Sequence, residues 1–216
     1  MGRLATHLAS QYVGHPLRVG VDGVCGAGKT TFARELAQAV RERGRGVILL
    51  DSDGFHHVRA RRYRQGRDSA RGYYEDAYDL EALAERVLVP LGPGGTRQYA
   101  EKVHDLASDA VISDRTATAE PDAVLIAEMT FLQRGALRAL WEEVVFLDVD
   151  LAVATERAVA RDAVALGGES AARAAYSSRY RAACEIYLAE ERPAERASIL
   201  IAHDDPARPR ILRGPA

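Results

Sequence analysis

The stretch from Gly23 to Thr30 constrains the fold of this chain more than any other. It reads Gly-Val-Cys-Gly-Ala-Gly-Lys-Thr, with an apolar run at residues 17–21 before it and helical periodicity over residues 31–37 after it. A glycine-rich turn between a strand and a helix lets successive backbone N–H groups converge on one point, where the helix N-terminus adds positive potential. The stretch therefore predicts a phosphate-binding loop.

This loop also predicts a nucleotide and its metal ion. Lys29 is expected to reach the β- and γ-phosphates, and the Thr30 hydroxyl is expected to hold Mg²⁺. Only Lys29 and Lys102 are lysines among 29 basic residues, so a chain that otherwise uses arginine has lysine where the loop requires it. We predict ATP and Mg²⁺ as cofactors. The expected nucleotide-binding residues are Gly23, Val24, Cys25, Gly26, Ala27, Gly28, Lys29, Thr30 and Thr31.

Two other kinds of nucleotide-binding protein are disfavoured. The glycines at positions 23, 26 and 28 are spaced G-x-x-G-x-G, which differs from the G-x-G-x-x-G of nicotinamide and flavin enzymes. An Asn-Lys-x-Asp guanine signature does not occur, which makes a GTPase switch a weak alternative.

Composition predicts an ordinary globular protein. A net charge of −2 gives no general attraction to nucleic acid or to an anionic membrane, so neither is expected as a partner. Two cysteines, Cys25 and Cys184, do not form a disulfide framework. No apolar run approaches membrane-spanning length and no signal-peptide pattern is recognisable, so a cytoplasmic location is expected. Composition leaves oligomeric state open, a homo-oligomer included.

The apolar pattern predicts an α/β fold. Five short buried runs alternate with helical segments, at residues 17–21, 47–50, 123–127, 144–147 and 198–201. This alternation is typical of a five-stranded, mostly parallel sheet sandwiched by helices, with the phosphate-binding loop after its first strand. Residues 59–75 show no clean period and are expected to form a loop or flap. Residues 96–120 are polar and broken, as in a small hairpin or lid-like insertion.

Acidic residues follow several of these predicted strands. Asp51 and Asp53 end the second strand, and Glu128 ends the third. Ligands of parallel sheets bind beyond the carboxyl ends of the strands, so these acids are expected at the site. Asp53 is the predicted catalytic base and Asp51 the predicted cap of the turn, while Glu128 is expected to bind Mg²⁺ with Thr30.

Two arginines complete the predicted phosphate site. Arg157 and Arg161 lie one turn apart on a predicted helix over residues 151–165. Arg161 is predicted to stabilise transition-state charge, and Arg157 to bind nucleotide.

The acceptor side of the site is less defined. The basic run at residues 59–67 follows the predicted base, so we expect a substrate flap or a solvated loop in preference to a nucleic-acid patch. Tyr73, Tyr74, Tyr99 and His104 are predicted substrate contacts, by stacking or hydrogen bonding.

The order of these motifs resembles the uridine kinase-like P-loop kinases, a group that includes phosphoribulokinase and bacterial-type pantothenate kinase. The resemblance rests on the loop, on Asp53-Gly54-Phe55-His56, on residues 74–79 and on the strand that ends at Glu128, and it spans roughly residues 17–202. It implies a P-loop kinase domain over residues 1–216, with an acceptor-binding insertion at 59–120 and a lid at 157–180. By the resemblance, Asp53 is the catalytic aspartate, His56 is a substrate contact and Arg161 belongs to the lid.

The sequence also departs from that family. Tyr73 occupies the position at which uridine kinases carry a ribose-binding aspartate, Met129-Thr130 replaces a usual glycine, and the lid is thinned around residues 165–169. The prediction is therefore an ATP-dependent kinase of a small-molecule hydroxyl, with a nucleoside acceptor favoured. The alternatives are a pantothenate or sugar-phosphate kinase, and a regulatory module that binds nucleotide without transferring phosphate.

Overall fold

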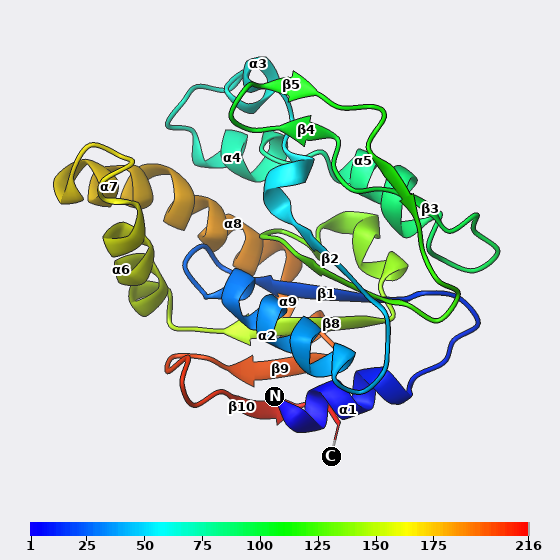
Figure 1. The fold of residues 1–216 in the computed structure, drawn as a ribbon. Helices are drawn as coiled ribbons and strands as arrows, with labels where there is room; N and C mark the ends of the chain where they lie inside the picture. The colour runs from blue at the N-terminus through cyan, green and yellow to red at the C-terminus, as the bar shows by residue number, and fades with distance from the viewer. Residues whose placement is uncertain (216) are drawn as a thin grey trace.

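A six-stranded sheet forms the centre of the computed structural model, which describes residues 1–215 (Figure 1). From one edge to the other, its strands are β10 (Arg210–Arg213), β9 (Ile199–Ala202), β8 (Glu143–Asp148), β1 (Leu17–Gly23), β7 (Val124–Glu128) and β2 (Val47–Asp51). All neighbours pair in parallel except β10, which lies antiparallel on β9. The α/β architecture with a mostly parallel sheet is as predicted.

The predicted number of strands was wrong, because the sheet has six. The additional strand, β10, reads Arg-Ile-Leu-Arg and lies at the exposed edge of the sheet. It contains two apolar residues between two arginines, so it lacks the buried apolar run by which the other five strands were recognised. Charged side chains are typical of edge strands, because they discourage pairing with another chain.

The register of the sheet brings the acidic strand ends together. In β1, Val21 pairs with Glu128 of β7, and on the other side of β7 Glu128 pairs with Asp51 of β2. Since these strands are parallel, their carboxyl ends meet at one edge, where the loop between β1 and α2 (Lys29–Arg41) also begins.

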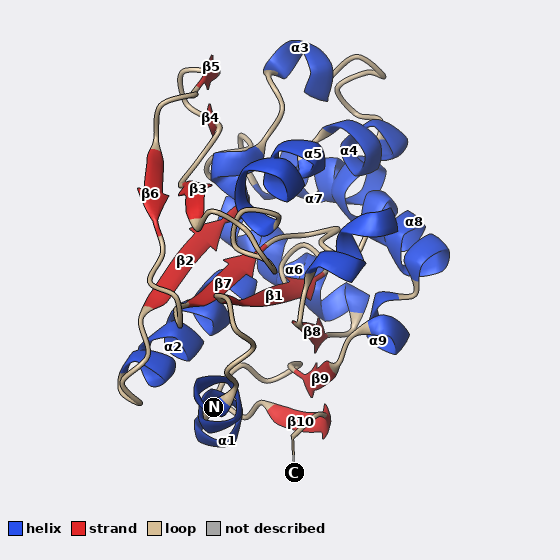
Figure 2. Cartoon of the chain, turned by 90° about the vertical axis from the view of Figure 1, so that its right-hand side faces the viewer, coloured by secondary structure: helices blue, strands red, loops and turns tan. Residues whose placement is uncertain are grey.

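Helices cover both faces of the sheet (Figures 1 and 2). On one face α1 (Gly2–Ser10) packs against α2, and on the other face α4 (Ala70–Asp76) packs against α8 (Arg181–Glu191). The remaining helices and turns are α5 (Leu80–Leu83) with the π turn η2 (Ala84–Leu88), the 3₁₀ turns η1 (Ser52–Phe55) and η3 (Gly135–Leu140), α6 (Leu151–Asp162), α7 (Glu169–Ala175), the π turn η4 (Tyr176–Tyr180) and α9 (Pro193–Arg196). None of the helices within residues 1–215 is long and apolar enough to cross a membrane.

The segment after η1 is more ordered than the sequence suggested. Residues 59–75, expected as a loop or flap, contain α3 (Arg59–Arg62) and most of α4. Both helices are too short to show a clear period, and α4 is started by Ser69, whose hydroxyl accepts a hydrogen bond from the Gly72 N–H at 2.9 Å. Asp79 caps α5 by accepting a hydrogen bond from Ala82 N–H at 2.9 Å.

Two small antiparallel pairs follow, as expected for residues 96–120. Strand β3 (Gln98–Ala100) pairs with β6 (Thr116–Thr118), and β4 (His104–Asp105) pairs with β5 (Ala110–Val111). Figure 2 shows these strands stacked along one side of the molecule, beyond the β2 edge.

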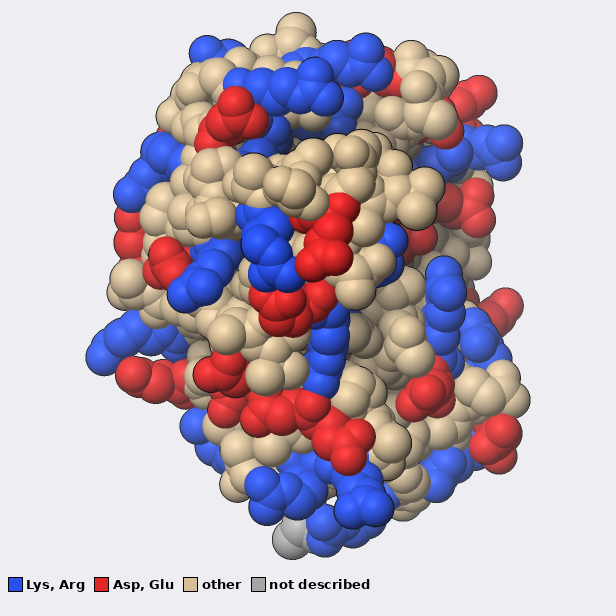
Figure 3. Space-filling view, turned by 90° about the vertical axis from the view of Figure 1, so that its left-hand side faces the viewer, with Lys and Arg blue, Asp and Glu red and all other residues tan. Residues whose placement is uncertain are grey.

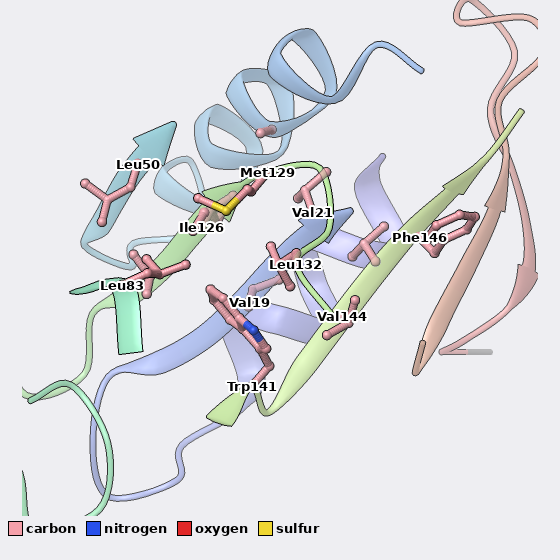
Figure 4. Packing of buried hydrophobic residues seen from close by; sticks show 14 of the residues in the cluster. Val19, Val21, Leu50, Leu83, Ile126, Met129, Leu132, Trp141, Val144 and Phe146 are labelled. Atoms are coloured by element: carbon pink, nitrogen blue, oxygen red, sulfur yellow. The ribbon is translucent and has the colours of Figure 1, made fainter. Parts of the chain in front are cut away.

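The hydrophobic core packs against both faces of the sheet around β1 and β7. Val19, Val21 and Ile126 are fully buried, and Trp141 and Leu83 close the core on the face opposite α2 (Figure 4). Burying such side chains contributes roughly 1.5–3 kcal/mol each. The core therefore holds rigid the strands whose ends carry the acids.

Candidate active site

The phosphate-binding loop has the backbone shape that its sequence predicts. Gly26 and Gly28 adopt φ angles of +83° and +88°, which glycine tolerates without strain. A Cβ atom at Gly26 would lie 2.0 Å from the carbonyl oxygen of Ala154 in α6, so only glycine fits there. Lys29 folds over the loop, and its Nζ donates hydrogen bonds of 3.0 Å to the carbonyl oxygens of Gly23 and Val24.

A buried carboxylate supports this loop from below. Asp22 is fully buried at the end of β1, where it accepts hydrogen bonds from Gly23 N–H at 2.8 Å, the Tyr187 hydroxyl at 2.5 Å and Gln133 Nε2 at 3.0 Å. Burial raises the pKa of Asp22, and these hydrogen bonds and the charge of Lys29 oppose that rise. Asp22 was not predicted from the sequence, although its position directly after the apolar run at residues 17–21 could have marked it.

The predicted metal ligands are in contact. The Thr30 hydroxyl donates to Glu128 Oε1 at 2.9 Å, and Glu128 is buried at the end of β7. Burial raises the pKa of Glu128; Lys29 and Thr30 oppose the rise, whereas Asp51 and Asp53 add to it. No group of three or more potential metal-binding side chains occurs within residues 1–215. A hydroxyl and a carboxylate fit Mg²⁺, which is commonly held by one or two protein oxygens together with substrate phosphates and water.

The two aspartates after β2 have different surroundings. Asp51 caps η1, accepting from the N–H groups of Asp53 at 3.1 Å and Gly54 at 3.3 Å. Asp53 is freer: its carboxylate is largely exposed, and its nearest polar partner is His56 Nε2 at 3.8 Å. Neighbouring residues partly desolvate the Asp53 carboxylate, and this desolvation and the nearby charge of Asp51 raise its pKa. The positive charge of Arg161 opposes the rise. Asp53 thus has a carboxylate available to a ligand, whereas Asp51 is used by the turn.

The predicted lid arginines lie on α6. Arg157 Nη1 donates to the carbonyl oxygen of His203 at 3.2 Å, and Arg157 also donates to the carbonyl oxygen of Asp204. Arg161 bonds to the Asp162 carboxylate at 2.7 Å and to the Tyr176 hydroxyl at 3.2 Å. Each guanidinium is held in place by the protein while lining the same cleft as the loop.

That cleft has a volume of about 1290 Å³ and gathers most of the predicted site. Among its lining residues are the predicted Cys25, Gly26, Gly28, Lys29, Thr30, Thr31, Asp53, His56, Tyr73, Glu128, Arg157 and Arg161. Gly23, Val24 and Ala27 belong to the loop but do not line the cleft. Figure 3 shows the face that carries α6 and α7, where basic and acidic side chains are mixed and basic ones gather at the top, level with α3.

Three predicted substrate contacts are not on the cleft. The Tyr74 ring packs against Phe131, with 5.2 Å between ring centroids. Tyr99 is buried in β3, and His104 is buried and bonded to Asp109 at 3.1 Å. None of these three residues lines the cleft, so the structure does not bring them to the site.

Cys25 has an unusual environment inside the loop. Its N–H donates to Cys184 Sγ at 3.3 Å, and its own Sγ lies 3.8 Å from the Tyr73 hydroxyl. Hydrogen bonding to Cys184 and the charge of Lys29 lower the pKa of the Cys25 thiol to about 6, although burial acts in the opposite direction.

Several cleft residues were not identified from the sequence. The basic run supplies Arg59, Arg62 and Arg67, so its arginines face the cleft instead of forming a merely solvated loop. Arg179 lines the cleft from η4, more than a hundred residues further along the chain. No sequence pattern joins these positions, because only the packing of η4 on α4 brings them together.

Comparison with known proteins supports the same family of folds. The uridine kinase of Halalkalibacterium halodurans is 25% identical over 150 residues, which is 68% of this chain and 67% of that protein. A possible uridine kinase from Bacillus stearothermophilus superposes with a TM-score of 0.70 at 26% identity, covering 91% of this chain and 94% of the other. A protein proposed to be the kinase of a fructose transport system in Silicibacter sp. TM1040 gives 0.69 at 22% identity, covering 87% and 92%. No family model matches the chain.

Proposed function

We propose that this chain, a uridine kinase-like P-loop kinase, transfers the γ-phosphoryl group of Mg·ATP to a hydroxyl group of a small molecule. The observation that carries the proposal is the convergence of the loop, the Thr30–Glu128 pair and the Asp53 carboxylate on one cleft. These are the parts that phosphoryl transfer requires: a cradle for the phosphates, a metal-binding position and a base for the acceptor.

The loop and its lysine would hold the nucleotide. The N–H groups of residues 23–30 and the N-terminus of α2 provide positive potential for the phosphates. Lys29, already beside the loop carbonyls, would bind the β- and γ-phosphates, and Arg157 and Arg161 would face them from α6. Thr30 and Glu128 would hold Mg²⁺, which would supply positive charge to offset the charge that develops on the transferred phosphoryl group.

Asp53 would remove the proton of the acceptor hydroxyl. Its carboxylate faces the cleft and is not used by the turn that Asp51 caps. A positioned base contributes about 10²–10⁴-fold to the rate. His56, 3.8 Å from Asp53, and Tyr73 would contact the acceptor along the same wall. The relatives named uridine kinase favour a nucleoside acceptor, with pantothenate and sugar phosphates as the alternatives.

Asp53→Asn tests this assignment. We expect kcat to fall about 10²–10⁴-fold, because the amide cannot accept the proton, while affinity for a non-hydrolysable ATP analogue changes little. Asp114→Asn is the matched control, since Asp114 is exposed and outside the cleft. Unchanged turnover of Asp53→Asn would overturn the role of Asp53 as base. ATP binding without phosphorylation of any acceptor would instead favour the regulatory module.

The pH dependence of turnover provides a second measurement. Because burial and Asp51 raise the pKa of Asp53 above its ordinary value of 3.8, the carboxylate becomes protonated at a higher pH than a free aspartate. We expect kcat/KM to fall as pH decreases through that raised pKa. The acid limb should therefore lie above pH 3.8, and Asp53→Asn should abolish it.

A further inference from the structure

Four arginines line the part of the cleft that the nucleotide loop does not form. Arg59, Arg62 and Arg67 come from α3 and the segment after it, and Arg179 comes from η4. Over the whole cleft, eight cationic side chains face four carboxylates. The four carboxylates belong to Asp51, Asp53, Glu128 and Asp162, so none comes from the segments that supply these four arginines.

Arg179 is a buried cation without an anionic partner. Its residue is 6% exposed, and no carboxylate of residues 1–215 lies within 4 Å of its guanidinium. Nη1 donates to the carbonyl oxygen of Arg67, whereas Nε has no acceptor in the described chain. Charged side chains are rarely buried this far unless they are paired.

Aromatic rings surround the Arg179 guanidinium but do not neutralise it. Its Cζ atom lies 4.8 Å from the ring centre of Tyr63, 5.1 Å from that of Tyr73 and 5.4 Å from that of Tyr180. Cation–π contacts offset part of the desolvation cost and fix the plane of the group. They leave in-plane N–H donors for an oxygen anion, which is the geometry in which arginine binds carboxylate and phosphate.

Arg62 is a second buried guanidinium, and it packs on one of the same aromatic rings. It is 8% exposed, and its Cζ atom lies 5.7 Å from the Tyr63 ring on which Arg179 also packs. Nη2 is bonded to Asp109 at 3.2 Å, but Asp109 also accepts from His104 and from the N–H of Arg59. Asp109 therefore positions Arg62 while its charge is shared, and Arg62 Nε has no acceptor in the described chain.

A continuous row of contacts connects these arginines to the proposed base. Asp53 is 3.8 Å from His56, which stacks on Tyr78 with 4.5 Å between ring centres. The Tyr78 hydroxyl is 3.2 Å from that of Tyr73, and the Tyr73 ring contacts Arg179. One small molecule along this wall would present a hydroxyl to Asp53 and its other end to the two arginines.

We propose that the acceptor carries an anionic group, a carboxylate or a phosphate, which Arg62 and Arg179 bind at the end remote from the reacting hydroxyl. The inference rests on the proposed kinase function and favours its anionic alternative acceptors over the neutral nucleoside that the relatives' names suggest. A neutral nucleoside would leave Arg179 without an anion and Arg62 with only the Asp109 carboxylate that it shares with His104 and Arg59 N–H. The phosphates of ATP would be bound by other residues of the cleft, namely the loop, Lys29 and the two arginines of α6.

Matched pairs of acceptors test the charge requirement. With Mg·ATP, pantothenate is compared with its neutral alcohol panthenol, and fructose 6-phosphate with fructose; uridine and cytidine are the neutral nucleosides. Product is detected by mass spectrometry and ADP release gives the rates. We expect at least one anionic acceptor to exceed its neutral counterpart by about 100-fold in kcat/KM, the order expected for lost hydrogen bonds to a charged group. The carboxylate and phosphate pairs distinguish the two sources of charge.

Arginine variants test the residues. We expect Arg179→Gln and Arg62→Gln each to raise KM for the anionic acceptor about 30-fold and to leave KM for ATP nearly unchanged, which also shows that the variant is folded. Arg179→Lys retains the charge and should recover part of the loss. Arg181→Gln is the control, because Arg181 is exposed, pairs with Glu185 at 3.0 Å and does not line the cleft.

The outcomes separate this inference from the proposed function. Phosphorylation of uridine as efficient as that of every anionic acceptor would leave the kinase function intact and overturn the anionic acceptor. An Arg179→Gln variant that raises KM equally for neutral and anionic acceptors would overturn it too. Phosphorylation of no acceptor at all would overturn the proposed function, and this inference with it.

Discussion

Removing a single hydroxyl group beneath the phosphate-binding loop should destabilise the protein measurably. Tyr187 is fully buried in α8; its hydroxyl donates to Asp22 at 2.5 Å and accepts from Gln133 N–H at 3.0 Å. Tyr187→Phe keeps the ring and deletes both hydrogen bonds. A hydrogen bond to a charged group contributes roughly 1.5–3 kcal/mol, and a neutral one about 1 kcal/mol. We therefore expect the free energy of unfolding to fall by about 3 kcal/mol.

Urea unfolding followed by circular dichroism measures this change. With a slope of roughly 2 kcal/mol per molar urea, a loss of about 3 kcal/mol lowers the midpoint by about 1.5 M. Tyr12→Phe is the matched control, since Tyr12 is 70% exposed and should stay within about 0.5 kcal/mol of the parent. A Tyr187→Phe midpoint close to that of the control, with an unchanged slope, would refute the argument that the hydroxyl supports Asp22.

The penalty should also depend on pH. Burial raises the pKa of Asp22, so the folded state holds this proton more tightly than the unfolded state and stability decreases as pH rises from 3.8 to the folded-state pKa. The Tyr187 hydroxyl limits that rise in pKa, because it bonds to the charged carboxylate. Removal of the hydroxyl should therefore raise the folded-state pKa of Asp22 further, so that the free energy of unfolding continues to decrease up to a higher pH. The difference between Tyr187→Phe and the parent should therefore grow as pH rises above 3.8, and a difference that stays constant with pH would contradict the assignment to Asp22.

Two further predictions concern the loop itself. Gly26→Ala should abolish ATP binding and lower the free energy of unfolding by about 2 kcal/mol more than Gly14→Ala does. Both glycines have φ near +82°, but only at Gly26 would a Cβ atom clash with the backbone of α6. Equal losses of stability would show that backbone strain alone causes the effect. Cys25 should react with iodoacetamide at a rate that is half-maximal near pH 6, as its lowered pKa requires, and Mg·ATP should protect it. Cys25→Ser should eliminate the labelling, and a rate that rises only above pH 8 would contradict the lowered pKa.

The fold could be predicted largely from local patterns. The strands β1, β2, β7, β8 and β9 are apolar runs in the sequence, and such a run is the signal by which a strand of a parallel sheet is recognised. The elements that were missed lack such a signal. β10 carries two exposed arginines, and α3 has only four residues, so neither a buried run nor a helical period could develop.

The site divides in a similar way. Lys29 and Thr30 belong to one continuous motif. Glu128 ends β7 and Asp53 lies two residues after the end of β2, and the parallel pairing of these strands fixes where they meet. These residues could be predicted because one local rule places each of them. Tyr99 and His104 were predicted to contact substrate, but both are buried away from the cleft, where His104 Nε2 bonds to Asp109.

The acceptor end could not be derived in this way, and the reason is topological. Arg62 and Arg179 share the Tyr63 ring although they are 117 positions apart, because η4 packs against α4 after the chain has passed through β7 and β8. A motif that binds phosphate through backbone N–H groups must be contiguous, whereas side chains that select an acceptor can come from any segments that meet. Kinases that share a phosphate-binding loop can therefore differ in the acceptor that they phosphorylate. In this chain, the buried guanidinium groups of Arg62 and Arg179 say more about the acceptor than the loop does.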